Sequence, residues 1–84
     1  MATTSAAEMI RIKLDNGMLP KDAPPKLWAG TGSGKACSAC EELIAPAQHE
    51  YELQYDDARA SIRFHLRCHG LWEAERRRRG DLLD

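Results

Sequence analysis

The chain is poor in the residues from which small proteins build a core or a covalent framework. Its 84 residues include three cysteines, two tryptophans, two tyrosines and one phenylalanine. Three cysteines cannot all pair with one another, so a disulfide framework is excluded. A chain of this length holds one small domain with a thin core, and such domains usually need a metal or another staple.

Other absences narrow the class of protein. No apolar run approaches the ~20 residues that span a bilayer, and residues 1–9 contain no lysine or arginine to begin a signal peptide. The net charge is −1, so the overall charge of the chain does not predict a polyanionic partner. The sequence shows none of the patterns that indicate catalysis: no paired carboxylates, no Ser/His/Asp set and no cysteine outside the expected metal site. The sequence therefore predicts a cytoplasmic protein that is neither an enzyme nor a membrane partner.

What the chain does contain is a complete set of zinc ligands. Cys37-x-x-Cys40 and His65-x-x-Cys68 use every cysteine, and enough sequence for a β-hairpin separates the two pairs. Zinc prefers four tetrahedral nitrogen and sulfur ligands, and structural sites draw them from two pairs on separate elements. We therefore expect one structural Zn²⁺ per chain, held by Cys37, Cys40, His65 and Cys68.

The neighbours of these ligands have expected roles as well. Three thiolates outweigh the charge of a zinc ion, and Arg63 and Arg67 flank the second ligand pair, where they could offset the excess. His69 is a spare candidate ligand, but its position one step around a helix from Cys68 predicts a surface or supporting role. The binding energy of the metal is folding energy, so its removal should unfold the hairpin and the last helix together.

Periodicity predicts the elements around this site. Ser5 and Glu8 match a capping box, which predicts a helix over residues 6–16 that stops at Gly17. Apolar and polar residues alternate over 50–55 and again over 61–64, which predicts an antiparallel hairpin with a turn at 56–59. Glu52 and Arg63 are expected to face one another across it. A helix should follow from His65 to Gly80.

Two further positions in the last helix carry predictions. Trp72 falls on the same helix face as His65 and Cys68, so it is expected in the core. Gly70 interrupts the helix, which predicts a close-packing position there.

The segment between the first helix and the zinc motif has no clear period. Pro20, Pro24 and Pro25 predict an extended, irregular arm, with Leu27 and Trp28 packed back onto the core. The glycine-rich stretch 30–34 predicts a flexible approach to Cys37. The chain therefore divides into a helix and arm over 1–35, a zinc core over 36–80 and a tail over 81–84. Knuckle, hairpin and helix predict a small α+β, treble-clef-like module.

Two resemblances agree with this interpretation. Residues 37–68 resemble the first zinc-binding half of a LIM domain, in Cys37-x-x-Cys40, Ile44 and the Phe64-His65 pair before Cys68; the second half is missing. Residues 10–72 resemble a group of small proteobacterial proteins. The shared pieces are Lys13-Leu14, Gly17-Met-Leu-Pro20, Lys26-Leu-Trp28-x-Gly30, Gly32-Ser-Gly34, Cys37-x-x-Cys40, Glu50-Tyr51-Glu52, Ile62-x-Phe64-His65-x-x-Cys68 and Trp72. This resemblance implies a bacterial cytoplasmic zinc-binding protein and a ligand set, but no activity.

Three functions remain open. We expect a binding or adaptor module with a protein partner. The first alternative is a nucleic-acid-binding protein that uses Arg63, Arg67 and 76–79, although the run 76–79 is better explained as a solvated helix end. The second alternative is a redox or zinc sensor, in which oxidation of the thiolates releases the metal.

Overall fold

The computed structural model describes residues 4–57, 59 and 61–80. Within them, the chain forms α1 (Ala6–Asp15), β1 (Lys26–Thr31), β2 (His49–Gln54), β3 (Ile62–His65) and α2 (Leu66–Arg79). The strands form one antiparallel sheet in the order β1-β2-β3. The predicted α+β class is confirmed, whereas the predicted tail 81–84 lies outside the described residues.

The first helix begins and ends within one residue of its prediction. Ser5 is the N-cap, and its Oγ accepts a hydrogen bond from the Glu8 amide at 3.1 Å. Asn16 is the C-cap and Gly17 has a φ of 83°, which glycine adopts without steric cost. Ile10 and Leu14 are fully buried. The N-terminal helix is therefore part of the core, a point that the sequence left open.

Strands β2 and β3 form the predicted hairpin in the predicted register. Glu52 lies opposite Arg63, and Arg63 Nη2 lies 3.5 Å from Glu52 Oε2. Leu53 and Phe64 point inward and are fully buried, as the alternation indicates. The predicted turn 56–59 contains residue 58, which lies outside the described residues, so that turn stays a prediction.

The third strand, β1, corrects the prediction of an irregular arm. Lys26–Thr31 is extended, as expected, but it pairs with β2 along its whole length. Leu27 and Trp28 do not anchor the chain on the core, because they are 47% and 56% exposed. The paired residues of β1 and β2 are 18 to 28 positions apart in the sequence, so the local prolines and glycines gave no sign of the pairing.

The stretch after β1 is ordered rather than a flexible loop. Gly32 donates to Gln48 O and Gly34 donates to Ile44 O, both at 2.9 Å. A Cβ built on Gly32 would lie 2.0 Å from Ala45 O. Only glycine can bring the backbone this close, so Gly32 lets the chain pack against residues 44–48 just before the first metal ligand.

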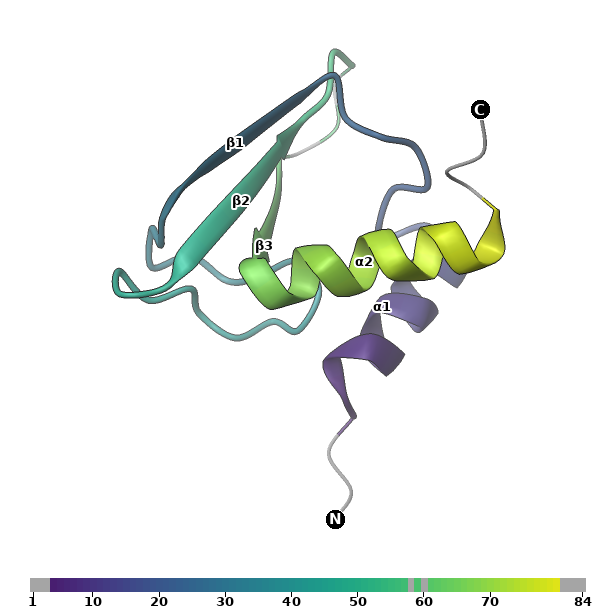
Figure 1. Ribbon diagram of the computed structural model, residues 1–84, viewed down its shortest axis with the longest axis horizontal. Coiled ribbons are helices and arrows are strands. Elements are labelled where there is room, and N and C mark those ends of the chain that lie inside the picture. Colours follow the sequence, from purple (N-terminus) through teal and green to yellow (C-terminus); the bar gives the residue numbers. More distant parts are fainter. Residues whose placement is uncertain (1–3, 58, 60, 81–84) are drawn as a thin grey trace.

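Helix α2 covers the end of the sheet and rests on α1 (Figure 1). It ends at Gly80, whose φ of 84° confirms the predicted stop. Trp72 is buried as expected, and its indole donates to Pro20 O at 3.0 Å. Gly70 is not the predicted close-packing position, because nothing lies within 4 Å of a Cβ built there.

The core lies between α1, α2 and the inner face of the hairpin. Its buried residues are Ile10, Leu14, Leu19, Cys37, Ala39, Ile44, Leu53, Phe64, Cys68 and Trp72. Two of the four expected metal ligands are members of this core, so the candidate metal site is continuous with it. Among the described residues, neither helix has the length and apolar character needed to cross a membrane.

Candidate metal centre

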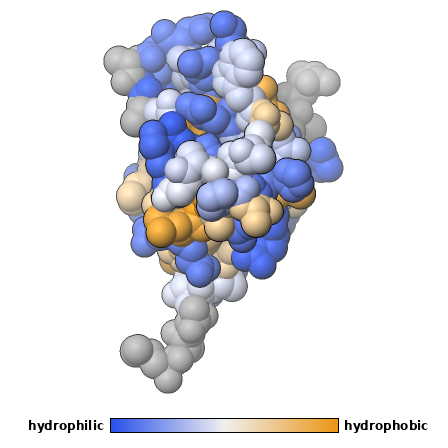
Figure 2. Space-filling view, turned by 90° about the vertical axis from the view of Figure 1, so that its left-hand side faces the viewer, coloured by the Kyte–Doolittle hydropathy of each residue, from blue (hydrophilic) through white to orange (hydrophobic). Residues whose placement is uncertain are grey.

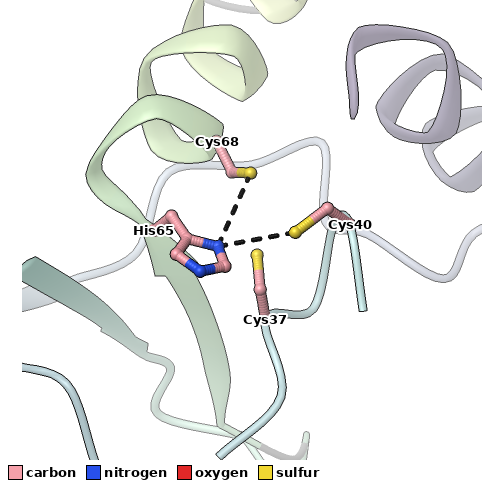
Figure 3. A group of neighbouring side chains, drawn as sticks. All are labelled: Cys37, Cys40, His65 and Cys68. Carbon is pink, nitrogen blue, oxygen red and sulfur yellow. Dashed lines mark hydrogen bonds between the residues drawn. The ribbon is translucent and has the colours of Figure 1, made fainter. Parts of the chain in front are cut away.

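The four side chains expected to bind zinc meet at one point (Figure 3). The ligand atoms of Cys37, Cys40, His65 and Cys68 all lie within 4.8 Å of one another. Three parts of the fold supply them. Cys37 and Cys40 come from the β1–β2 connection, His65 from the end of β3 and Cys68 from the first turn of α2.

The connection that carries the first pair forms a tight knuckle. Ala36 and Leu43 form an isolated antiparallel bridge, and the Cys37 amide donates to Glu42 O at 2.8 Å inside it. Glu41 turns the chain with a φ of 71°. The Ala39 amide lies 3.4 Å from Cys37 Sγ, as expected for a knuckle whose amides point at the sulfurs. This bond stabilises a thiolate at Cys37.

His65 lies at the junction of β3 and α2. It is the N-cap of the helix rather than a member of its first turn, which corrects the predicted start of the helix. Its Nε2 lies 3.2 Å from Leu43 O and donates to that carbonyl, so in the neutral imidazole the lone pair is on Nδ1. Nδ1 faces the sulfurs of Cys40 at 3.4 Å and Cys68 at 4.0 Å. The knuckle therefore orients the imidazole as a metal ligand.

The two distances from His65 Nδ1 fit a small tetrahedral ion. Zinc–sulfur bonds of about 2.3 Å and zinc–nitrogen bonds of about 2.0–2.1 Å give tetrahedral edges of roughly 3.5–3.8 Å. The two distances from His65 Nδ1, 3.4 and 4.0 Å, bracket those edges. A set of three sulfurs and one imidazole suits zinc better than magnesium or calcium, which prefer oxygen.

The three thiols perturb one another's pKa values. A hydrogen bond from the Cys68 thiol lowers the pKa of Cys37 to about 4. The same bond, together with burial, raises the pKa of Cys68 far above its ordinary value, and burial raises that of Cys40. Three thiols this close cannot ionise together unless a positive charge lies among them. A divalent metal bound among the sulfurs would supply that charge.

The arginines expected to offset the charge of the site do not all do so. Arg63 Nε lies 3.3 Å from Glu50 Oε2, and its Nη2 pairs with Glu52. Arg63 contacts the knuckle through its backbone, whereas Lys13 of α1 brings a charged group to it: Lys13 Nζ donates to Ser38 O at 3.0 Å. Sequence reasoning missed this residue, although its position three after Ile10 places it on the buried face of the helix.

His69 is not part of the metal cluster. Its ring packs on Tyr51, with centroids 4.5 Å apart, and its Nδ1 lies 3.6 Å from Glu73 Oε1. Burial lowers the pKa of His69. It supports the packing of α2 on the hairpin, in agreement with the sequence interpretation.

The arginine run at the end of α2 is only partly a solvated helix end. Arg76 is 2% exposed, stacks on Trp72 at 4.5 Å and donates to Lys21 O at 2.9 Å. Arg79 joins α2 to α1 through Asp15 at 2.8 Å. The prediction was wrong for these two side chains, because it could not include the contacts that the tertiary fold provides.

Glu75 holds the end of the run together. It is 8% exposed and pairs with Arg78 and Arg79. These hydrogen bonds lower its pKa to about 2. Three arginines of the run therefore have carboxylate or carbonyl partners within the molecule, which leaves Arg77 as the side chain without such a partner in the described part of the chain.

A hollow of about 380 Å³ lies beside the candidate metal centre. Its walls include His65 together with Leu43, Leu66 and Arg67. The two leucines are 66% and 50% exposed. Figure 2 shows an apolar patch within a mostly polar surface on the side of the molecule that carries the first turn of α2.

No protein-family model, curated protein or solved structure matches this chain.

Proposed function

We propose that this chain is a structural-zinc module that acts as a binding or adaptor protein and has no catalytic role. The observation that carries the proposal is the convergence of the Cys37, Cys40, His65 and Cys68 ligand atoms within 4.8 Å. Knuckle, hairpin and helix then form a treble-clef-like unit around one Zn²⁺. The resemblance to small bacterial zinc-binding proteins supports the same assignment, including a cytoplasmic location.

The donor set supports a structural rather than a catalytic metal. Catalytic zinc keeps a position open for water or substrate, whereas four protein ligands fill a tetrahedral shell. Cys37 and Cys68 are 1% and 0% exposed, so solvent reaches little of these two ligands, whereas Cys40 and His65 are half-buried. Such metal sites contribute about 10–16 kcal/mol to folding at neutral pH. That range matches or exceeds the whole stability of most small domains, about 5–15 kcal/mol.

Cobalt titration tests the ligand set. Apoprotein titrated with Co²⁺ should develop the intense visible bands of tetrahedral cobalt and thiolate charge-transfer bands, saturating at one equivalent. His65→Ala should weaken and alter these bands. The matched control is His49→Ala, which removes a histidine that lies outside the cluster and should leave the titration unchanged. Octahedral spectra, or equal effects of the two substitutions, would reject the site.

The hollow beside the centre supports a protein partner. Leu43 and Leu66 expose apolar surface on two elements that the metal holds together, and Arg67 adds a cation beside them. Exposed apolar groups gathered around a hollow are typical of protein-binding surfaces. Leu66→Asp should abolish binding of a partner identified with the wild-type protein, whereas Ile12→Asp, at an equally exposed position on α1, should not. Equal binding by the two variants would remove this surface from the proposal.

The structure weakens the case for nucleic-acid binding. Arg63, Arg76, Arg78 and Arg79 make internal contacts, so four of the six arginines of the proposed basic surface already have partners within the molecule. Of the other two, Arg67 lines the same hollow as Glu42, and Arg77 follows Glu73 by four residues in α2. Retention on DNA or RNA should therefore be weak and insensitive to salt, whereas affinity that falls steeply with salt would revive this alternative.

The proximity of the thiols favours the redox-sensor alternative as the second candidate. Peroxide can take two electrons from two neighbouring thiolates, which form a disulfide while the peroxide is reduced to water. The metal would lose two ligands in this step and leave. Zinc release at mild peroxide doses, measured with a chromogenic chelator, supports this function. Retention of the metal until harsh oxidation rejects it.

A further inference from the structure

Strand β1 is an open edge of the sheet. Each of its six residues is exposed, and among the helices and strands it contacts β2 alone. In Figure 1 it is the outermost strand, and α2 lies across the opposite part of the sheet. Long uncovered edges are rare in natural sheets, because unpaired backbone groups recruit another strand.

The register shows which backbone groups are free. Gly32 donates to Gln48 O at 2.9 Å, directly beyond the paired residues Thr31 and His49. Bonded and non-bonded positions alternate along an antiparallel pair, so the even-numbered residues of β1 bond to β2. The amides and carbonyls of Leu27, Ala29 and Thr31 therefore point toward the open edge.

Both faces of β1 carry unpartnered apolar surface. Leu27 lies on the face shared with Leu53, and Trp28 lies on the opposite face beside Glu52. The two side chains are 47% and 56% exposed. A strand added to this edge would cover both of them at once, which a ligand on one face could not do.

Charge on the Trp28 face favours a particular occupant. Glu50 and Glu52 share a single ion-pair partner, Arg63, so one carboxylate charge on this face, which also carries Lys26, has no partner of its own. A hollow of about 160 Å³ lies over Gly30, between Trp28 and the two glutamates. Nothing lies within 4 Å of a Cβ built on Gly30. A basic side chain on the incoming strand opposite Gly30 would fit the space and the charge.

The chain carries such a side chain in the same strand. Lys26 is exposed and has no ion-pair partner within the described residues. In an antiparallel pair of two β1 strands centred on Trp28, Lys26 of each copy lies opposite Gly30 of the other. The same register places the outward groups of Leu27 opposite those of Ala29, as hydrogen-bonded pairs. The two Trp28 residues then meet at the two-fold axis, in the closer, non-bonded type of pair.

We propose that β1 is a dimerisation edge, through which two copies of this chain form a continuous six-stranded antiparallel sheet. The interface is isologous, because each copy offers the same strand, the same glycine and the same lysine. Its central contacts come from one strand per copy, so it belongs with the small and transient interfaces. We expect a dissociation constant of the order of 100 µM.

Sedimentation equilibrium of the metal-loaded chain, from about 10 µM to about 1 mM, tests the dimer. Ala29→Pro removes an outward amide and leaves the bonds to β2 in place, and the matched control Ala29→Ser keeps that amide. We expect Ala29→Pro to abolish association and Ala29→Ser to retain it. Lys26→Glu should raise the dissociation constant about 3–10-fold, whereas Lys26→Arg should leave it unchanged.

Amide hydrogen exchange identifies the edge. The amides of Leu27, Ala29 and Thr31 should gain protection as concentration rises, whereas those of Trp28 and Gly30 should be protected throughout. A chain that stays monomeric over the whole range overturns the proposal. So does a dimer with equal affinity in Ala29→Pro and Ala29→Ser. Amide dispersion and metal content show whether Ala29→Pro folds. If it does not fold, Lys26→Glu and Lys26→Arg test the proposal, and equal dissociation constants for these two variants overturn it. Metal content is measured separately, so failure here is distinct from failure of the zinc assignment.

Discussion

Lys13→Met tests how the N-terminal helix is joined to the metal centre. Lys13 Nζ donates to Ser38 O at 3.0 Å and to Glu41 Oε2 at 2.9 Å, while its side chain is 9% exposed. Methionine keeps most of the buried aliphatic chain and removes the ammonium. The Ser38 carbonyl then loses a charged donor inside the fold.

The expected loss can be estimated from these contacts. A hydrogen bond from a charged donor contributes about 1.5–3 kcal/mol, and a buried acceptor left without a partner loses a similar amount. The pair with Glu41 adds little, because that carboxylate is exposed to solvent. We therefore expect Lys13→Met to lower the free energy of unfolding by about 1.5–3 kcal/mol.

Urea unfolding of the metal-loaded protein, followed by tryptophan fluorescence, measures this change. The matched control is Arg11→Met, an exposed substitution on the same helix that should stay within about 0.5 kcal/mol of the wild type. Equal stability of the two variants would refute the reasoning that α1 stabilises the knuckle through Lys13.

Three further substitutions test other parts of the fold. Glu75→Gln removes a carboxylate whose pKa hydrogen bonds from two arginines lower to about 2. The variant should therefore be less stable than the wild type above pH 4.5, the ordinary pKa of the group, and the difference should vanish as pH falls toward 2. Thermal melts of both proteins measure this difference, and a difference independent of pH would contradict the prediction. Trp72→Ala should lower the free energy of unfolding by about 3–5 kcal/mol, and the exposed Trp28→Ala by less than about 1 kcal/mol, in dilute protein. Gly32→Ala places a Cβ 2.0 Å from a carbonyl oxygen and should prevent folding, whereas Gly30→Ala enters open space; similar amide spectra for both would show that the contact can relax.

The sequence predicted the parts of the fold that depend on local chemistry. The Ser5 cap, the alternation of the hairpin and the Gly80 stop each follow from residues a few positions apart. The residues of the candidate metal centre could also be predicted, because two short spacings suffice to specify them.

The features that the sequence did not predict depend on contacts between distant segments. Strand β1 has no alternating pattern, because both of its faces are exposed, and its pairing with β2 depends on the folded sheet. Lys13 and Arg76 are buried charged residues whose carbonyl partners lie in other segments. Composition indicates a solvated position for such side chains, and only the tertiary fold provides the partners that make burial favourable.

Metal analysis combined with a fold measurement tests the central claim most directly. Purified chain should contain one zinc ion by native mass spectrometry, and its amide spectrum should lose dispersion over residues 36–80 when a chelator removes the metal. Readdition of one equivalent of Zn²⁺ should restore the spectrum. A protein that contains no metal and keeps the same dispersed spectrum would contradict the account, because the fold would then be stable with Cys37, Cys40 and Cys68 as free thiols.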